Sequence, residues 1–83
     1  MPYLDKAIRA SLDSGRKARI GGELNYQISK LVNDFIAMRG LSYSVVNEIV
    51  GALECAKLEA YRRIAAPYED KKALANGEVY TVL

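Results

Sequence analysis

The sequence predicts a small all-α domain, and three observations support this fold class. Apolar residues recur every three or four positions in three segments, as they do along one face of a helix. A glycine or a proline follows each of these segments, where it would end a helix. The chain has 83 residues, 51% hydrophobic and 27% charged, so one globular domain over residues 1–83 is expected. We predict a short N-terminal helix, two main antiparallel helices at about 23–39 and 43–66, a short helix after Pro67 and an extended C-terminal tail.

The N-terminal helix is expected to begin after Pro2 and to end at Gly15. Leucine and isoleucine recur at every fourth position between these two residues, which produces a narrow apolar stripe. Residues 15–22 then contain three glycines and three basic residues without any periodicity. This segment therefore indicates a flexible connection to the next helix.

The second helix has an apolar row with steps of four and three residues, a pattern typical of helices that pack along a seam. Gly40 follows this row and is expected to end the helix. The row consists of Leu24, Ile28, Leu31, Phe35 and Met38.

The third helix can be capped by Ser42 or Ser44, and no break other than Gly51 interrupts its pattern before Pro67. At ~1.5 Å per residue it would be roughly 35 Å long, against a diameter nearer ~30 Å for a compact chain of this size. Part of this helix is therefore expected to project beyond its own core. The residues predicted to form its buried seam are Val46, Ile49, Leu53, Ala56, Ala60 and Ile64.

Pro67 is expected to kink the third helix or to begin a new one in its first turn. The new helix would end at Asn76-Gly77. Residues 78–83 have the composition of a strand but no partner strand in this chain. We therefore expect an extended tail that lies on a neighbouring subunit.

Small residues recur at every fourth position of the third helix, at Ala52, Ala56 and Ala60, and would let another helix approach closely. That neighbour is either the second helix or a second copy of the chain. Six tyrosines accompany a single phenylalanine, and tyrosine is typical of interfaces. We expect a homo-oligomer whose interface contains these alanines together with Tyr68 and Tyr80.

Composition excludes several classes of function. The chain has no histidine, which removes His-based triads and His-ligated metal sites. Cys55 is the single cysteine, so an intramolecular disulfide is impossible and a reducing cytoplasm fits best. No apolar run approaches the ~20 residues needed to span a bilayer, and residues 1–5 lack the layout of a signal peptide. We expect a cytoplasmic protein without membrane contact, metal or cofactor.

Catalysis within one chain is not expected. Glu54 and Glu59 are five residues apart on a helix, so their carboxylates point in different directions. Cys55 lacks a histidine base and is expected to be a buried packing thiol. We therefore predict that the protein is not an enzyme.

A carboxylate, an ammonium and a phenol converge on one face of the third helix. The second helix has a similar stripe of polar side chains. If the two helices pair, the two stripes would line a polar cleft. An ammonium beside a phenol suits phosphate binding and base stacking, so a nucleotide-like anion is the expected ligand. The predicted ligand-binding residues are Glu54, Lys57, Tyr61 and Arg62 on the third helix and Tyr26 and Lys30 on the second, where Glu23 and Asn33 share the face. The alternative is that these charges form ordinary surface ion pairs, Glu54 with Lys57 and Glu59 with Arg62 or Arg63.

The segment Arg16–Gly22 leads into a helix N-terminus, where free backbone N–H groups favour an anion such as phosphate. Glu23 in the first turn already satisfies the helix dipole and would repel a phosphate, which favours a plain solvated linker. Residues 1–22 hold five Lys and Arg against two Asp, a net charge of +3. A net charge of +2 for the whole chain is too weak to predict a nucleic-acid partner, although binding through Arg16, Lys17 and Arg19 is a third possibility.

The chain resembles a family of small uncharacterised proteins encoded by bacteriophages and by bacteria through prophages. The resemblance covers most of the chain and rests on Gly22–Tyr26, on Leu53–Arg63, on Ala66–Lys72 and on Asn76–Tyr80. It implies a phage-type setting and a cytoplasmic accessory protein, and it carries no activity over. Short helical phage proteins that assemble and sequester nucleotide immune signals offer an analogy at the level of fold.

These observations lead to two hypotheses of function. The first is a non-enzymatic homo-oligomer that binds or sequesters a small anionic, nucleotide-like ligand between chains, in counter-defence. The alternative is a protein-interaction module in which the tyrosines and the C-terminal tail bind or inhibit a host or phage protein.

Overall fold

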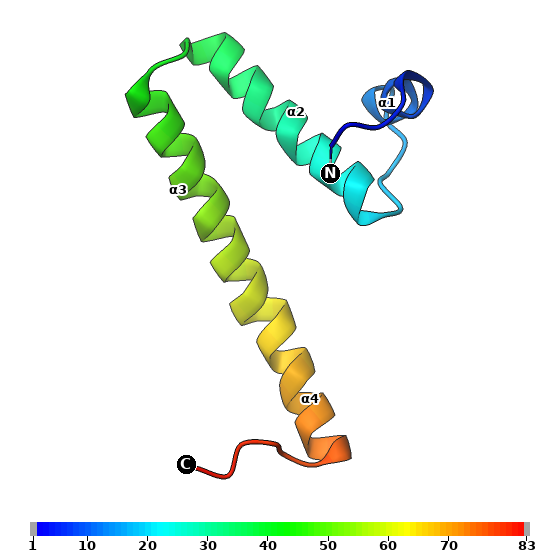
Figure 1. Ribbon diagram of the computed structural model, residues 1–83, viewed down its shortest axis with the longest axis vertical. Coiled ribbons are helices and arrows are strands. Elements are labelled where there is room, and N and C mark those ends of the chain that lie inside the picture. The colour runs from blue at the N-terminus through cyan, green and yellow to red at the C-terminus, as the bar shows by residue number, and fades with distance from the viewer. Residues whose placement is uncertain (1, 83) are drawn as a thin grey trace. The chain divides into compact units, whose positions relative to one another are not determined.

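The computed structural model describes residues 2–82, and the all-α prediction is confirmed (Figure 1). No strand is present in this part of the chain. The chain divides into two compact units, residues 1–46 and residues 47–83. The helices are α1 (Lys6–Asp13), α2 (Gly21–Arg39), α3 (Tyr43–Ala60), a π-helical turn η1 (Tyr61–Ala65) and α4 (Ala66–Asn76).

The first unit contains α1 packed against α2, and side chains cap the starts of α1 and α3. Asp5 caps α1, where its carboxylate accepts a hydrogen bond from the backbone N–H of Ile8 at 3.0 Å. Ser42 is the predicted cap that forms at α3, because its hydroxyl accepts from the backbone N–H of Val45 at 3.1 Å. Leu12 and Val45 are the hydrophobic side chains buried among residues 2–82.

Glycines end two of the helices. Gly40 follows α2 with φ 88° and Gly77 follows α4 with φ 96°, a region that side chains with a Cβ rarely enter. In each case the glycine N–H donates to the carbonyl four residues earlier, Ile36 at 2.7 Å and Ala73 at 2.8 Å. Both helix ends lie where the sequence predicts them.

Pro67 lies inside a helical run that continues from α3 through η1 into α4 without a non-helical residue. The proline has no N–H, and in a regular α-helix its ring would clash with the carbonyl of Arg63, four residues earlier. The π turn relieves this conflict, since the N–H of Ala66 donates to the carbonyl of Tyr61, five residues earlier. A new helix therefore follows the proline as predicted, but without an intervening break.

The prediction of a buried seam on the third helix is wrong. None of residues 47–82 is buried, and Leu53 and Ile64 are 42% and 69% exposed. The physical reason is that the second unit consists of one helical run and a tail, and a helix cannot cover its own apolar face. The apolar row of α2 is uncovered in the same way, with Leu31 70% and Met38 84% exposed, because the eight residues of α1 reach only part of it.

Residues 77–82 form the extended tail predicted from the sequence. The Glu78 carboxylate accepts from the backbone N–H groups of Val79 and Tyr80 at 2.9 and 3.1 Å. Tyr80 itself is 74% exposed. That the tail lies on a neighbouring subunit stays a prediction.

Candidate functional site

The most elaborate side-chain arrangement lies in the first unit, where α1 meets α2. The Arg9 Nε donates to the Leu4 carbonyl at 2.8 Å, and the guanidinium lies over the Tyr26 ring, 5.7 Å from its centroid. The Tyr26 hydroxyl lies 2.9 and 3.0 Å from the two Asp13 carboxylate oxygens, to which it donates. The two contacts of Tyr26 join residues 13 and 17 positions apart and fix the position of its ring between the two helices.

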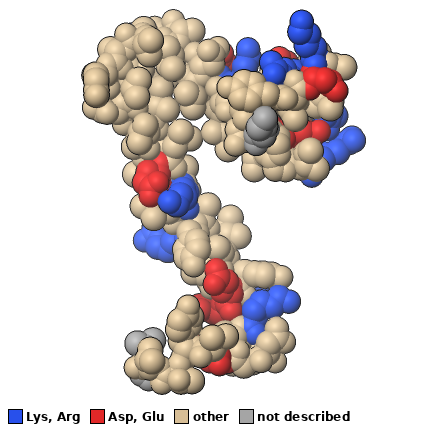
Figure 2. All heavy atoms as spheres, in the orientation of Figure 1, with Lys and Arg blue, Asp and Glu red and all other residues tan. Residues whose placement is uncertain are grey.

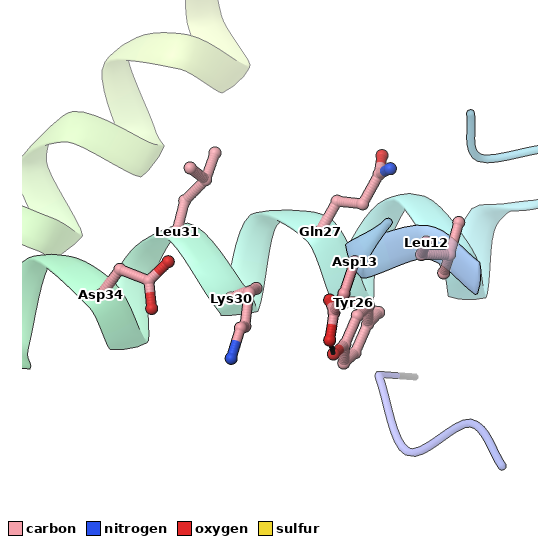
Figure 3. Close-up of a pocket in the computed structure, with 7 residues that line it drawn as sticks. All are labelled: Leu12, Asp13, Tyr26, Gln27, Lys30, Leu31 and Asp34. Carbon is pink, nitrogen blue, oxygen red and sulfur yellow. Dashed lines mark hydrogen bonds between the residues drawn. The ribbon is translucent and has the colours of Figure 1, made fainter. Parts of the chain in front are cut away.

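Two hollows share Tyr26 and Lys30. The first, which we name the carboxylate groove, has a volume of about 650 Å³ and is lined by Leu12, Asp13, Tyr26, Gln27, Lys30, Leu31 and Asp34. The second, which we name the basic groove, has a volume of about 380 Å³ and is lined by Pro2, Tyr3, Arg9, Tyr26, Ser29, Lys30 and Asn33. Figure 3 shows Tyr26 and Lys30 directed to the same side of α2, while Leu31 points away from them.

The Tyr26 phenol is perturbed by this environment. Its pKa is raised above the ordinary value of 10.0, first by desolvation and then by the hydrogen bond to the Asp13 carboxylate, which favours the protonated phenol. At neutral pH Tyr26 is therefore a hydrogen-bond donor already engaged by Asp13. Its ring, rather than its hydroxyl, is the part left for a ligand.

The segment before α2 is fixed by an ion pair rather than flexible. The Arg16 guanidinium donates to both Glu23 carboxylate oxygens at 3.2 and 3.1 Å, and the backbone N–H of Arg19 donates to the same carboxylate at 2.9 Å. These donors hold the pKa of the buried Glu23 carboxyl below its usual value. The carboxylate thus already engages the Arg16 guanidinium and the Arg19 N–H, which favours the plain linker over a phosphate site in this segment.

The predicted face of the third helix consists of exposed ion pairs. The Lys57 ammonium lies 3.4 Å from Glu54, and the Arg62 and Arg63 guanidinium groups lie 2.7 and 2.9 Å from Glu59. The two arginines lower the pKa of Glu59, with the Arg63 hydrogen bond the larger cause. Lys and Arg atoms lie beside Asp and Glu atoms along this helix in Figure 2. The ion-pair alternative weighed from the sequence is therefore what the structure shows, and a ligand role for this face stays a prediction.

The predicted ligand-binding residues fall into both units. Tyr26 and Lys30 lie in the first unit, whereas the other four residues lie on α3 and η1 in the second. Tyr61 is exposed on the π turn.

The residues predicted to form the oligomer interface are all exposed, namely Ala52, Ala56, Ala60, Tyr68 and Tyr80. The Lys72 ammonium lies over the Tyr68 ring, 5.6 Å from its centroid.

Four residues of the basic groove were missed by the sequence reasoning, namely Pro2, Tyr3, Arg9 and Ser29. Arg9 lies over the Tyr26 ring through the packing of α1 on α2, and no spacing in the sequence signals that contact. The helical spacing of Tyr26, Lys30 and Asn33 did place them on one face, and all three line the groove. Cys55 was expected to be buried and is instead exposed, since nothing in the second unit covers α3.

Residues 2–82 contain neither a candidate metal-binding cluster nor a helix that could cross a membrane. No group of three or more His, Cys, Asp or Glu side chains there is arranged to hold a metal ion. The helices between residues 2 and 82 also lack the combination of length and apolar character that crossing a membrane requires.

These features define a small all-α protein with uncovered apolar helix faces and a basic groove on its N-terminal half. The chain belongs to the family described as domain of unknown function DUF6899, whose model matches residues 1–79. Neither a curated protein nor a solved structure matches the chain.

Proposed function

We propose that this protein is a non-enzymatic, self-assembling protein in which the apolar face of α3 packs against the same face of a second copy. One observation carries the proposal. The row of apolar residues has the a and d spacing of a coiled coil, and none of its members is buried. The members of this row, named the α3 seam from here on, are Val46, Ile49, Leu53, Ala56 and Ala60.

Residues 47–82 lack a core of buried side chains. Ordering the backbone costs about 1–2 kcal/mol per residue, and full burial of a leucine, isoleucine or valine side chain returns about 1.5–3 kcal/mol. Since no side chain between residues 47 and 82 is buried, the second unit by itself gains little of this stabilising free energy of burial. Its folding is therefore coupled to association.

Helix length supports a second copy as the occupant of the α3 seam. The helical run of the second unit, residues 47–76, is about 45 Å long at ~1.5 Å per residue, whereas the 19 residues of α2 span about 28 Å. A helix as short as α2 is long enough for residues 46–60 but not for the rest of the run, where Ile64 and Leu74 are 69% and 89% exposed. A second copy offers a face of equal length with the same repeat, which is the self-complementary arrangement of most homo-oligomers.

The test is a measurement of mass in solution by light scattering on the full chain and two matched variants. Ala56→Glu places a charge in the α3 seam and is expected to reduce the mass to that of a monomer. Leu58→Glu adds the same charge about 200° around the helix, away from the seam, and is expected to retain the oligomer. A monomer mass for the unmodified chain, or an unchanged mass for Ala56→Glu, would contradict the proposal.

A second candidate is a module that binds a host or phage protein through the C-terminal tail. The observation that favours it is the exposure of the tail side chains, 83% for Val79 and 86% for Val82. A chain lacking residues 78–83 should then keep its oligomer mass but lose a stoichiometric partner captured from nuclease-treated host lysate. Capture that persists without the tail would eliminate this candidate.

A further inference from the structure

The basic groove of the first unit brings two cations together without a carboxylate in its lining. Arg9 is held in place by the Leu4 carbonyl and by the Tyr26 ring, so its position is set before any ligand arrives. The Lys30 ammonium has no hydrogen bond or ion pair with any residue between 2 and 82. Its charge is therefore available to a ligand, and an anion is the ligand that both groups favour.

Polar and aromatic groups complete the lining. The Asn33 side chain has no hydrogen-bond partner within the part of the chain described, so its amide can donate to a ligand oxygen. The Ser29 hydroxyl donates to the Asn25 side chain at 3.2 Å and keeps its acceptor capacity for a ligand hydroxyl. The Tyr3 ring is 77% exposed at the edge of the groove, which leaves it open for a planar group to stack on.

The neighbouring carboxylate groove is larger but has the wrong charge for an anion. Asp13 and Asp34 both line it, and they would repel a phosphate or carboxylate. Tyr26 and Lys30 form the boundary between the two grooves. The difference in lining therefore directs an anionic ligand to the side of Arg9 and Tyr3.

We propose that the basic groove binds a small phosphate-bearing ligand that also carries a planar ring, the chemistry of a nucleoside monophosphate. The phosphate lies between the Arg9 guanidinium and the Lys30 ammonium, and the ring stacks on Tyr3. The volume of about 380 Å³ is within the range of small-ligand sites, roughly 300–1,000 Å³. All seven lining residues belong to the first unit, so the site does not require association through the α3 seam.

The experiment is a calorimetric titration of the full chain with AMP. Lys30→Gln removes one of the two cations and is expected to weaken AMP binding about tenfold, the effect of losing one charge-assisted hydrogen bond. Lys17→Gln removes the same charge from an exposed residue outside both grooves and is expected to bind AMP like the unmodified chain. Asn33→Asp brings a carboxylate into the lining and is expected to abolish binding.

Two further probes separate the parts of the ligand. Adenosine, which lacks the phosphate, and inorganic phosphate, which lacks the ring, are both expected to bind more weakly than AMP. Equal affinity for AMP and adenosine would overturn the proposal, as would equal effects of Lys30→Gln and Lys17→Gln. No heat of AMP binding at concentrations up to about 1 mM would also overturn it, and would leave self-association untouched.

Discussion

Glu23 determines the path of the chain between α1 and α2. Its carboxylate accepts hydrogen bonds from the Arg16 side chain and the Arg19 backbone, and both residues lie in the segment between α1 and α2. A glutamate in the first turn of a helix that reaches back to a preceding N–H resembles one half of a capping box. Here it also neutralises an arginine, which converts a glycine-rich connection into a defined one.

The depressed pKa of Glu23 predicts acid sensitivity of the first unit. Because the native-state pKa lies below the ordinary value of 4.5, the ion pair stabilises the fold fully above about pH 4.5. This stabilisation is lost as the pH falls through the native-state pKa. Glu23→Gln should lower the free energy of unfolding at neutral pH and flatten its dependence on pH below 4.5.

Urea unfolding followed by circular dichroism at several pH values, at one protein concentration, measures this effect. Glu54→Gln is the matched control, because it removes a carboxylate whose ion pair with Lys57 is exposed at both ends. It should leave the pH dependence nearly unchanged. Identical pH profiles for the two variants would show that the Glu23 ion pair has no role in the acid response.

At the scale of elements, the π turn at Tyr61–Ala65 shows how a helix can continue through a proline. The additional residue in the turn rotates everything after it by about 100° relative to a regular α-helix. Tyr68 and the rest of α4 therefore do not continue the α3 seam in the register that the sequence repeat would give. The regular a and d spacing of the α3 seam is therefore found before the π turn.

Replacing the proline should allow a regular helix. In Pro67→Ala the N–H of residue 67 can donate to the carbonyl of Arg63, and the ring that opposed this carbonyl is absent. We expect the free energy of unfolding to rise by about 1–3 kcal/mol, measured from denaturation followed at 222 nm. Pro2→Ala, outside every helix, should have little effect. A loss of stability in Pro67→Ala would instead mean that the π turn is itself favourable in the folded protein.

At the scale of the molecule, the small number of buried side chains predicts that folding is coupled to assembly. Leu12 and Val45 are the buried hydrophobic residues among 2–82, fewer than a stable domain of 83 residues needs. Much of the apolar surface that is not buried lies in the exposed rows of α2 and α3. The folded state is therefore expected to depend on contacts between copies.

This coupling predicts a midpoint of thermal unfolding that rises with protein concentration. Mass action favours the associated, folded state at high concentration, so a hundredfold dilution should lower the midpoint of the unmodified chain. Ala56→Glu should unfold at a midpoint that is lower and independent of concentration. A midpoint for the unmodified chain that does not move on dilution would show that each chain is stable alone.

The sequence by itself determined the helices and their ends. Periodicity, the Ser42 cap and the glycines after α2 and α4 are local signals, because helical hydrogen bonds and caps join residues within a few positions along the chain. The same local logic placed Tyr26, Lys30 and Asn33 on one face of α2. It also anticipated the ion pairs of α3, whose partners are three or four residues apart.

Tertiary structure alone decided which of these faces are covered and which charges meet. Arg16 pairs with Glu23, and Arg9 and Asp13 both engage Tyr26, across segments whose path no spacing rule predicts. Periodicity identifies an apolar face but not the surface that covers it. Burial against any apolar surface of complementary shape would lower the free energy of the folded state to a similar extent. For this reason the seam of α3 was recognised from the sequence, whereas its exposure, and the basic groove beside α1, emerged only once the helices were placed.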